Sequence, residues 1–443
     1  MQIMNHFTIF CLVACIVLFS FWFILPIAPY ANVRSTTATD VNGSIYVSPL
    51  HNISLLSLPR PTVATPLIST NDRIVFTIGD LHGDLGCAIA AVELTGLVVG
   101  DLTRMSHRWT WTDLTAKIVF VGDYIDRGPQ SKGVLELVMT LQVRFPNHVI
   151  ALLGNHEIEA LLDRDRVRDR RQLVVHYPSS YVNLYELQNW VPHDTIIDET
   201  RDAVGAIYRA LLDRVYGESR SYVTISPNGP NSIVDLVEPK SFRPIVRREL
   251  ERLQQAYIDG FSGEIGKWLE QMPITHTSDD GKLLFVHGGI DPEHFARGRA
   301  LSGGRRALVA LNEQFRQNSR KESLAKFIQS NAGEVVYDLL TYRGNHGNCR
   351  SIDAIKAATG ASHVIVGHTP DTTVRIRCQN SFLAVDSMIS RWIRTAGNNY
   401  CKGTERAVSG NGRFACGVVG KCMGEIVKMT KTDDGWVSGV IAL

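Results

Sequence analysis

Five short motifs of the sequence combine glycine with aspartate, asparagine or histidine, and each follows an apolar run directly. They are Gly79-Asp80-Leu81-His82-Gly83-Asp84, Gly122-Asp123-Tyr124-Ile125-Asp126-Arg127-Gly128, Gly154-Asn155-His156-Glu157, His287-Gly288-Gly289 and Gly367-His368-Thr369. Any one of them could be an ordinary turn, because glycine and aspartate both suit tight turns. Their repetition in one context favours a single site to which all five contribute.

The side chains of these motifs suit transition metals. Carboxylate and amide oxygens together with imidazole nitrogens favour Mn, Fe or Zn over Ca, which prefers ligands made of oxygen alone. Two cations about 3.5–4 Å apart need a shared ligand, and we predict that Asp123 is that bridge. Glycines beside the ligands let the backbone come close to the ions without a Cβ in the way. The sequence therefore predicts a site for two divalent metal ions.

The apolar runs before the motifs predict the strands of an α/β domain. Helices are expected after the first two motifs, over about 85–95 and 131–144. Strand, loop and helix in repetition imply crossover connections, and in such domains ligands bind at the carboxyl ends of the strands. The expected strands cover 73–78, 117–121, 148–153, 282–286, 363–366, 382–385, 425–429 and 436–441.

Two long connections interrupt this pattern. Residues 158–281 are predicted to form an inserted cap with a helical stretch from about 241 to 272, because the connection far exceeds an ordinary loop. The charged run Asp163–Arg171 within it is interpreted as a solvated helix face. The second connection, 292–342, is expected to be mostly helical.

The first 33 residues are predicted to hold a membrane anchor. Phe7–Ile27 contains no charged residue and is long enough, as a helix, to cross a bilayer core of about 30 Å. A cleaved signal peptide is the alternative, although its apolar stretch is normally shorter and small residues precede the cut. Residues 34–70 are rich in Pro, Ser, Thr and Asn and are interpreted as a linker, and 71–443 as the catalytic domain.

The net charge and the glycosylation sequons indicate which partners and which compartment to expect for the domain. A net charge of +2 gives no field that would attract nucleic acid, so no such partner is expected. Glycosylation sequons at Asn42 and Asn52 favour a lumenal or extracytoplasmic catalytic domain.

Six cysteines follow the anchor without CxxC spacing, which argues against a zinc ribbon. Cys87 is expected to be a free thiol on a buried helix face, whereas the other five could include disulfides.

The motifs resemble the signature of the phosphoprotein phosphatase superfamily of metallophosphoesterases, from about Arg73 to the C-terminus. Within it, the chain is most similar to the Shewanella-like protein phosphatases. The matching features are GDLHGD, LLGNHE before a long insertion, Tyr342-Arg343-Gly344 followed by Cys349, and IVGHTP followed by LAVDSMIS. The sequence lacks the Ser-Ala-Pro-Asn-Tyr motif of the well-known eukaryotic Ser/Thr phosphatases, which fits this group. The resemblance implies an α/β sandwich of two mixed β-sheets flanked by helices, with the metals at one rim.

The resemblance also implies a role for each motif residue. Six residues would bind the two metal ions: Asp80 and His82 the first, Asn155, His287 and His368 the second, and Asp123 both. Arg127 and Arg343 would hold the phosphate, whose oxygens suit a bidentate guanidinium. Only a short Arg-Gly match supports Arg343, and a surface-loop arginine is its alternative reading. His156 would be the general acid, oriented by Asp126.

These roles predict the metal-dependent hydrolysis of phosphate monoesters, with phosphoproteins or phosphopeptides as substrates. A hydroxide that bridges the metals would attack phosphorus in line, and His156 would protonate the leaving oxygen. A nucleotide or dinucleoside-polyphosphate hydrolase of the diadenosine-tetraphosphatase type shares most of the motifs, although the pair Asp126 and Arg127 argues against it. The non-enzyme alternative is a membrane-tethered pseudophosphatase that acts as a binding module. The intact ligand set argues against that alternative.

Overall fold

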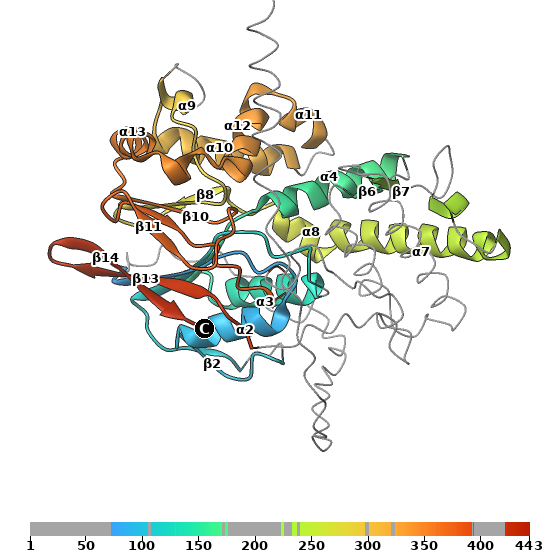
Figure 1. Cartoon of the computed structure of the whole chain (residues 1–443), viewed down its shortest axis with the longest axis horizontal. Helices are drawn as coiled ribbons and strands as arrows, with labels where there is room; N and C mark the ends of the chain where they lie inside the picture. The colour runs from blue at the N-terminus through green and yellow to red at the C-terminus, as the bar shows by residue number, and fades with distance from the viewer. Residues whose placement is uncertain are drawn as a thin grey trace, which may run out of the picture. The chain divides into compact units, whose positions relative to one another are not determined.

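Two five-stranded β-sheets frame the part of the chain that the computed structural model describes (Figure 1). That part comprises residues 72–104, 108–128, 130–170, 173–175, 223–225, 233–236, 240–296, 301–319, 324–391, 393 and 421–443. In spatial order, the first sheet contains β14 (Gly435–Ala442), β13 (Glu425–Thr432), β1 (Ile74–Ile78), β4 (Ala116–Phe120) and β5 (Val149–Ala151). The second contains β11 (Arg375–Arg377), β12 (Phe382–Ala384), β10 (His363–Val366), β9 (Leu283–Val286) and β8 (Thr275–Thr277).

Both sheets mix parallel and antiparallel strands. In the first sheet, β1, β4 and β5 run parallel, and β13 joins β1 in the antiparallel sense. In the second sheet, β9, β10 and β12 run parallel, and β8 and β11 are antiparallel edge strands. The predicted α/β class with two mixed sheets is therefore confirmed. Two small two-stranded antiparallel sheets accompany them, β2 (Val98–Val99) with β3 (Thr110–Trp111), and β6 (Leu173–Val175) with β7 (Val223–Ile225).

The inner faces of the two sheets pack against each other. Val75 of β1 and Val119 of β4 share one buried cluster with Phe285 of β9 and Ile365 of β10. The neighbouring residues in the same strands point the other way and join a second cluster with the helices, because side chains alternate along a strand. The strand sequences are apolar on both faces for this reason, since each sheet is covered on both sides.

Helices cover the outer face of each sheet (Figure 1). The first sheet carries α2 (Leu85–Leu94), α3 (Ser131–Arg144) and α8 (Glu264–Leu269), and α3 contacts both α2 and α8. The second carries α10 (Arg305–Ser319), α12 (Asn331–Thr341) and α13 (Cys349–Thr359). The short helices α9 (Glu293–Ala296) and α11 (Leu324–Ile328) complete a connection that is mostly helical, as predicted for 292–342.

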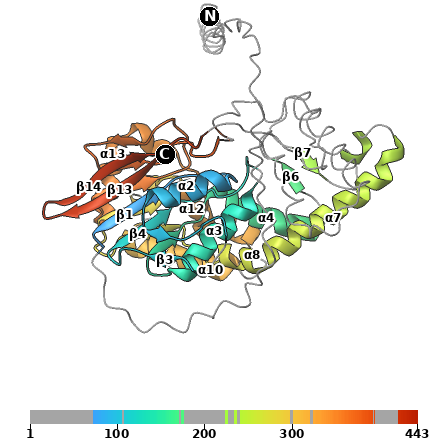
Figure 2. The ribbon, with the colours of Figure 1, turned by 90° about the horizontal axis from the view of Figure 1, so that it is seen from below.

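The predicted cap, 158–281, falls only partly on the described residues. It begins within α4 (Asn155–Arg170), which lies side by side with α7 (Arg243–Ser262), and two 3-10 turns, Ile233–Leu236 and Lys240–Phe242, precede α7 (Figure 2). The helical stretch expected from 241 to 272 is two helices, because the chain breaks at Gly263 between α7 and α8. The end of the predicted cap, β8, is a strand of the second sheet.

The solvated-face interpretation of the charged run Asp163–Arg171 is wrong at its start. Asp163, Arg164 and Asp165 are all buried. The guanidinium of Arg164 donates to Asp165, to the carbonyl of Phe261 at 3.0 Å and to Glu270 at 2.6 Å. Phe261 lies near the end of α7 and Glu270 follows α8, so Arg164 fastens α4 to both helices instead of facing water.

Two disulfides join distant parts of the chain. Cys349 pairs with Cys378, and Cys87 pairs with Cys422. The expectation of a free thiol at Cys87 is therefore wrong, although the residue is buried on α2 as predicted. Its partner lies 335 residues further along the chain.

The predicted anchor and the linker both lie outside the described residues. Among the residues that the structure does describe, no helix has the length and apolar character needed to span a bilayer.

Candidate metal centre

The five motifs lie at the carboxyl ends of five strands. The first follows β1, the second follows β4, the third opens α4 after β5, and the last two follow β9 and β10. Because β1, β4 and β5 run parallel, and β9 runs parallel to β10, each sheet presents its motifs along one edge. The structure therefore brings the six predicted metal ligands together.

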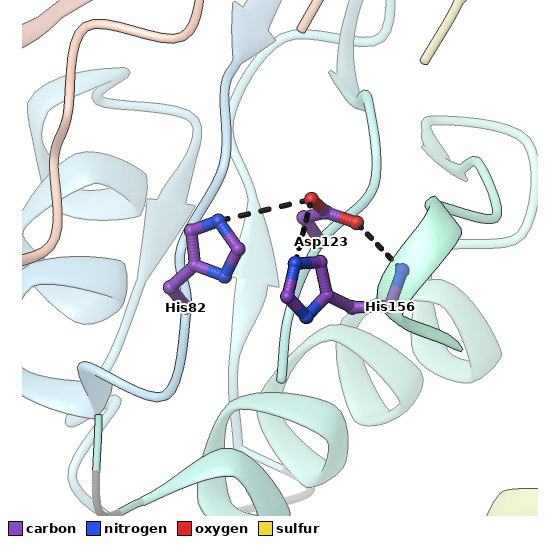
Figure 3. A group of neighbouring side chains, drawn as sticks. All are labelled: His82, Asp123 and His156. Carbon is purple, nitrogen blue, oxygen red and sulfur yellow. Dashed lines mark hydrogen bonds and ion pairs between the residues drawn. The ribbon is translucent and has the colours of Figure 1, made fainter. Parts of the chain in front are cut away.

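Asp123 is the centre of this arrangement. Its Oδ1 lies 3.2 Å from Nε2 of His287, and its Oδ2 lies 3.7 Å from Nε2 of His82 and 3.8 Å from Nε2 of His156. Figure 3 shows the carboxylate facing the His82 and His156 rings, with an interaction to each. Two groups of side chains could each hold a metal ion: Asp123 with His82 and His156, and Asp123 with His287 and His368. Asp123 belongs to both groups, which is the position predicted for a bridging ligand.

Backbone carbonyls fix which ring nitrogen stays available in each of the three histidines predicted to be ligands. Nδ1 of His82 donates to the carbonyl of Ile125 at 2.9 Å, and Nδ1 of His287 donates to the carbonyl of Val121 at 2.8 Å. In both rings Nε2 is left to face Asp123. His368 is reversed, since its Nε2 lies 3.1 Å from a carbonyl and Nδ1 stays available. Ligand histidines commonly hold their second nitrogen in this way, so these rings fit a metal site.

Electrostatics keep two of these rings neutral, as metal binding requires. Burial lowers the pKa of His82 well below its usual value, and the charge of Arg127 adds to this. Burial and the neighbouring His287 lower the pKa of His368 to about 3. For His287, burial also favours the neutral ring, but the Asp123 carboxylate outweighs it and the pKa rises. A divalent cation beside Asp123 would compete with that proton.

Asp80 and Asn155 complete the predicted ligand sets. Both oxygens of Asp80 accept from the backbone N–H of His368, at 3.1 and 3.2 Å, so the carboxylate links the two sheets. Burial raises the pKa of Asp80 well above its usual value, and the charges of Asp386 and Asp123 add to the shift. The amide oxygen of Asn155 lies 3.1 Å from Nε2 of His287. The buried carboxylates of Asp80, Asp123 and Asp386 lie close together, which suits a site that binds cations.

Several site residues hold left-handed backbone conformations. The φ angle is 37° at His82, 56° at Asp123, 68° at Asp126, 69° at Arg127 and 65° at His368. Such a conformation costs a residue with a Cβ about 1–2 kcal/mol, so the surrounding contacts must hold it in place. Strained backbone of this kind clusters at functional sites, where the turn aims the side chain.

His156 differs from the three histidines predicted to be metal ligands in the partner of its ring. Its Nδ1 lies 2.5 Å from Oδ2 of Asp126, a carboxylate instead of a carbonyl, and its backbone N–H donates to Asp123 at 3.1 Å. Burial alone would lower the pKa of His156, but the charge of Asp123 and the hydrogen bond to Asp126 outweigh it and the pKa rises. The pair suits a proton donor. The geometry around Asp123 would also permit His156 to act as a ligand.

Both predicted phosphate-binding arginines lie at the centre. Arg127 is close enough to His82 and His156 for its charge to lower their pKa values, and its buried Nε has no hydrogen-bond partner within the described residues. Nη1 of Arg343 donates to the carbonyl of His368 at 2.8 Å. Arg343 is exposed, as its alternative reading of a surface-loop arginine expects, but it also contacts the backbone of a predicted metal ligand.

Comparison with known proteins shows which family the chain belongs to. A model of the calcineurin-like phosphoesterases matches residues 75–226. An uncharacterized protein of Schizosaccharomyces pombe is 34% identical over 319 residues, which cover 71% of this chain and 72% of that protein. The chain is a calcineurin-like phosphoesterase. It is therefore a hydrolase of the metallophosphoesterase kind, as the motifs predicted.

More distant relatives of this phosphoesterase include protein phosphatases. Shewanella-like protein phosphatase 2 of Arabidopsis thaliana is 23% identical over 359 residues, which cover 77% of this chain and 78% of the relative. The crystal structure of a cold-active protein-tyrosine phosphatase from a psychrophilic Shewanella species matches with a TM-score of 0.45 and 18% identity. That match covers 84% of this chain and 80% of the other.

The sequence motifs of the phosphoesterase do not predict the structural role of Glu157. Its buried carboxylate accepts N–H groups from Asp123 at 3.0 Å, Tyr124 at 2.8 Å, Ile125 at 3.2 Å and Gly154 at 2.9 Å. One side chain thus holds the turn that carries Asp123 in register with the third motif. Glu157 stands next to His156 in the sequence, but three of its four partners come from a loop more than thirty positions earlier, which the sequence does not indicate.

Proposed function

We propose that this phosphoesterase hydrolyses phosphate monoesters of phosphoproteins or phosphopeptides with two divalent metal ions, of Mn, Fe or Zn. Asp80 and His82 would hold the first ion, Asn155, His287 and His368 the second, and Asp123 both. When bound, the ions would lower the pKa of a water molecule and supply positive charge beside the phosphate. The presence of a Shewanella-like protein phosphatase among the relatives supports a phosphoprotein substrate.

The observation that carries the proposal is the His156–Asp126 pair beside Asp123. A protonated His156 can donate a proton to the oxygen that leaves with the serine, threonine or tyrosine. Asp126, 2.5 Å from the opposite ring nitrogen, would fix the ring and stabilise its charge. Arg127 and Arg343 lie close to the two metal groups and can offer guanidinium N–H donors to the phosphoryl oxygens.

A substrate panel tests this proposal. The purified protein, with its metal content measured, would be assayed on phosphoserine, phosphothreonine and phosphotyrosine peptides, on p-nitrophenyl phosphate and on diadenosine tetraphosphate. We expect turnover of phosphopeptides to exceed turnover of the dinucleotide. Preference for the dinucleotide would support the polyphosphate hydrolase instead, and bound metals without any turnover would support the pseudophosphatase.

We further propose that the catalytic domain lies on the lumenal or extracytoplasmic side of a membrane, held by the N-terminal apolar segment. The two disulfides support this, because disulfides are rare in cytosolic proteins. The sequons at Asn42 and Asn52 agree with it. Treatment with an endoglycosidase should increase the gel mobility of the full chain, and carbonate washing should leave it with membranes. A chain that is released by carbonate with a new N-terminus near Asn32 would indicate a cleaved signal peptide.

A further inference from the structure

One segment of the chain contacts all three polar residues of the first motif. It follows β12, covers residues 385–391 and is called the clamp segment here. Ser390 donates to the carbonyl of His82 at 3.3 Å. Arg391 donates to both oxygens of Asp84, at 2.7 and 2.9 Å. The Asp386 carboxyl lies beside that of Asp80, close enough for the charges of the two groups to interact.

The clamp segment holds Asp386 in a fixed position. Oδ1 of Asp386 accepts the backbone N–H of Met388 at 3.1 Å, and Met388 adopts a left-handed conformation with φ of 52° to deliver it. The carbonyl of Asp386 accepts the N–H of Asp371 at 2.9 Å. A Cβ added at Gly79 would collide with the carbonyl of Val385 and lie 3.2 Å from Cα of Asp386, so the first motif approaches the segment as only glycine allows.

None of these contacts offsets a negative charge on Asp386 or Asp80. Asp386 is 2% exposed and Asp80 is 1% exposed. Within the described residues, neither carboxylate forms an ion pair with a lysine or arginine. Two buried acids in contact repel each other unless a proton or a cation lies close by. Asp80 is a predicted ligand of the first metal ion, so an ion bound there would offset both charges.

We propose that Asp386 is a positioning residue of the first metal site, which orients the carboxylate of Asp80 and adds a negative charge beside the ion. One oxygen of Asp386 accepts the Met388 N–H and its carboxyl lies beside that of Asp80, so it acts through Asp80 and not as one of the six ligands. Residues in this relation to a ligand typically change metal affinity by about 10–100-fold. This inference rests on the metal-dependent function proposed above.

Metal binding by Asp386→Asn tests the inference without relying on turnover. The substitution keeps the shape and the acceptor for Met388 but removes the charge. Titration with Mn²⁺, followed by calorimetry and by the paramagnetic resonance of free Mn²⁺, should show one site weakened by about 10–100-fold and one unchanged. Asp371→Asn is the matched control, because the Asp371 carboxylate pairs with Arg375 and contacts no predicted ligand. It should bind two ions as the unsubstituted protein does.

A second variant identifies which site is weakened. His368→Asn removes a predicted ligand of the second ion, so the ion that remains should occupy the first site. Adding Asp386→Asn to it should weaken that remaining ion, again by about 10–100-fold. Unchanged binding in Asp386→Asn, or equal weakening of both sites, would overturn the inference. If the unsubstituted protein bound no metal, the proposed function itself would fail, and the two failures are distinguishable.

Thermal unfolding separates positioning from structural support. In EDTA, Asp386→Asn should melt at the same temperature as the unsubstituted protein or higher, because it removes the repulsion between two buried acids. The rise in Tm on adding Mn²⁺ should be smaller in the variant. A lower Tm in EDTA with an unchanged rise on adding Mn²⁺ would mean that Asp386 only supports the fold, and would refute the proposal.

Discussion

Two substitutions at neighbouring residues should separate metal binding from proton donation. Asp123→Asn removes a charge that lies within 3.2–3.8 Å of three imidazole nitrogens and that belongs to both candidate metal groups. We therefore expect metal content and turnover of every substrate to fall together. His156→Asn removes the ring that Asp126 holds but none of the six predicted ligands, so we expect the metals to stay.

The expected loss in His156→Asn depends on the leaving group. A positioned general acid contributes about 10²–10⁴ in rate, equivalent to about 2.7–5.5 kcal/mol of transition-state stabilisation. A seryl alkoxide is a strong base and needs the proton, so phosphopeptide turnover should lose that full factor. A nitrophenolate is already stable as an anion, so turnover of the aryl ester should lose less than about tenfold.

The assay compares kcat on a phosphoserine peptide and on p-nitrophenyl phosphate for both variants, with metal content determined on the same samples. Asp126→Asn serves as a further comparison, because it leaves the His156 ring in place and removes the carboxylate 2.5 Å from its Nδ1. In Asp126→Asn, kcat on the phosphoserine peptide should fall more than kcat on p-nitrophenyl phosphate, as in His156→Asn, but the loss should be smaller.

Two results would refute this reasoning. Loss of metal from His156→Asn would show that His156 is a ligand, as its distance of 3.8 Å from Asp123 permits. Equal losses on both substrates with the metals intact would show that His156 acts through phosphate binding and not proton transfer.

Three further predictions concern stability. Glu157→Gln should lower the free energy of unfolding in EDTA by about 2–6 kcal/mol, because two backbone N–H groups lose their acceptor oxygen; a loss below 1 kcal/mol in urea unfolding would contradict this. The pKa of His276 is lowered by burial to about 4, so the unfolded chain binds the extra proton and stability falls as the pH drops from about 6.5 towards 4. From pH 7 to pH 5 this costs about 2 kcal/mol, and His276→Asn should remove that part of the slope. Removing the disulfide with the Cys349→Ser and Cys378→Ser pair should cost about 3–4 kcal/mol, and equal unfolding midpoints would show that the loop is held by other contacts.

The strands and motifs could be predicted because their signals are local. The run at 73–78 is apolar on both faces and ends in Gly79, and β1 forms at Ile74–Ile78. The histidine and aspartate ligands follow such runs directly, so their convergence followed from the rule that parallel strands share an edge. For Arg343 only a short motif resemblance predicts a role, and neither its own segment nor that of His368 indicates that the two residues make contact.

The features that the sequence did not predict depend on partners far along the chain. Arg164 is buried because Glu270, 106 positions away, meets it. Cys87 is oxidised because Cys422 reaches it across 335 residues. Asp386 lies in the LAVDSMIS motif, yet the sequence does not show that it is placed beside Asp80, 306 positions earlier in the chain. Spacing along the chain carries no information about such pairs, since each depends on how the two sheets pack.

The place of β1 has a consequence for how this protein is made. β1 is a central strand, hydrogen-bonded on one side to β4 and on the other to β13, which begins only at Glu425. At about 5–20 residues per second, synthesis of the intervening stretch takes about 20–70 s. During that interval one edge of β1 lacks its native neighbour and could pair with another chain. A product truncated before Glu425 would therefore keep one edge of β1 without its native partner, and we expect it to aggregate more readily than the full chain.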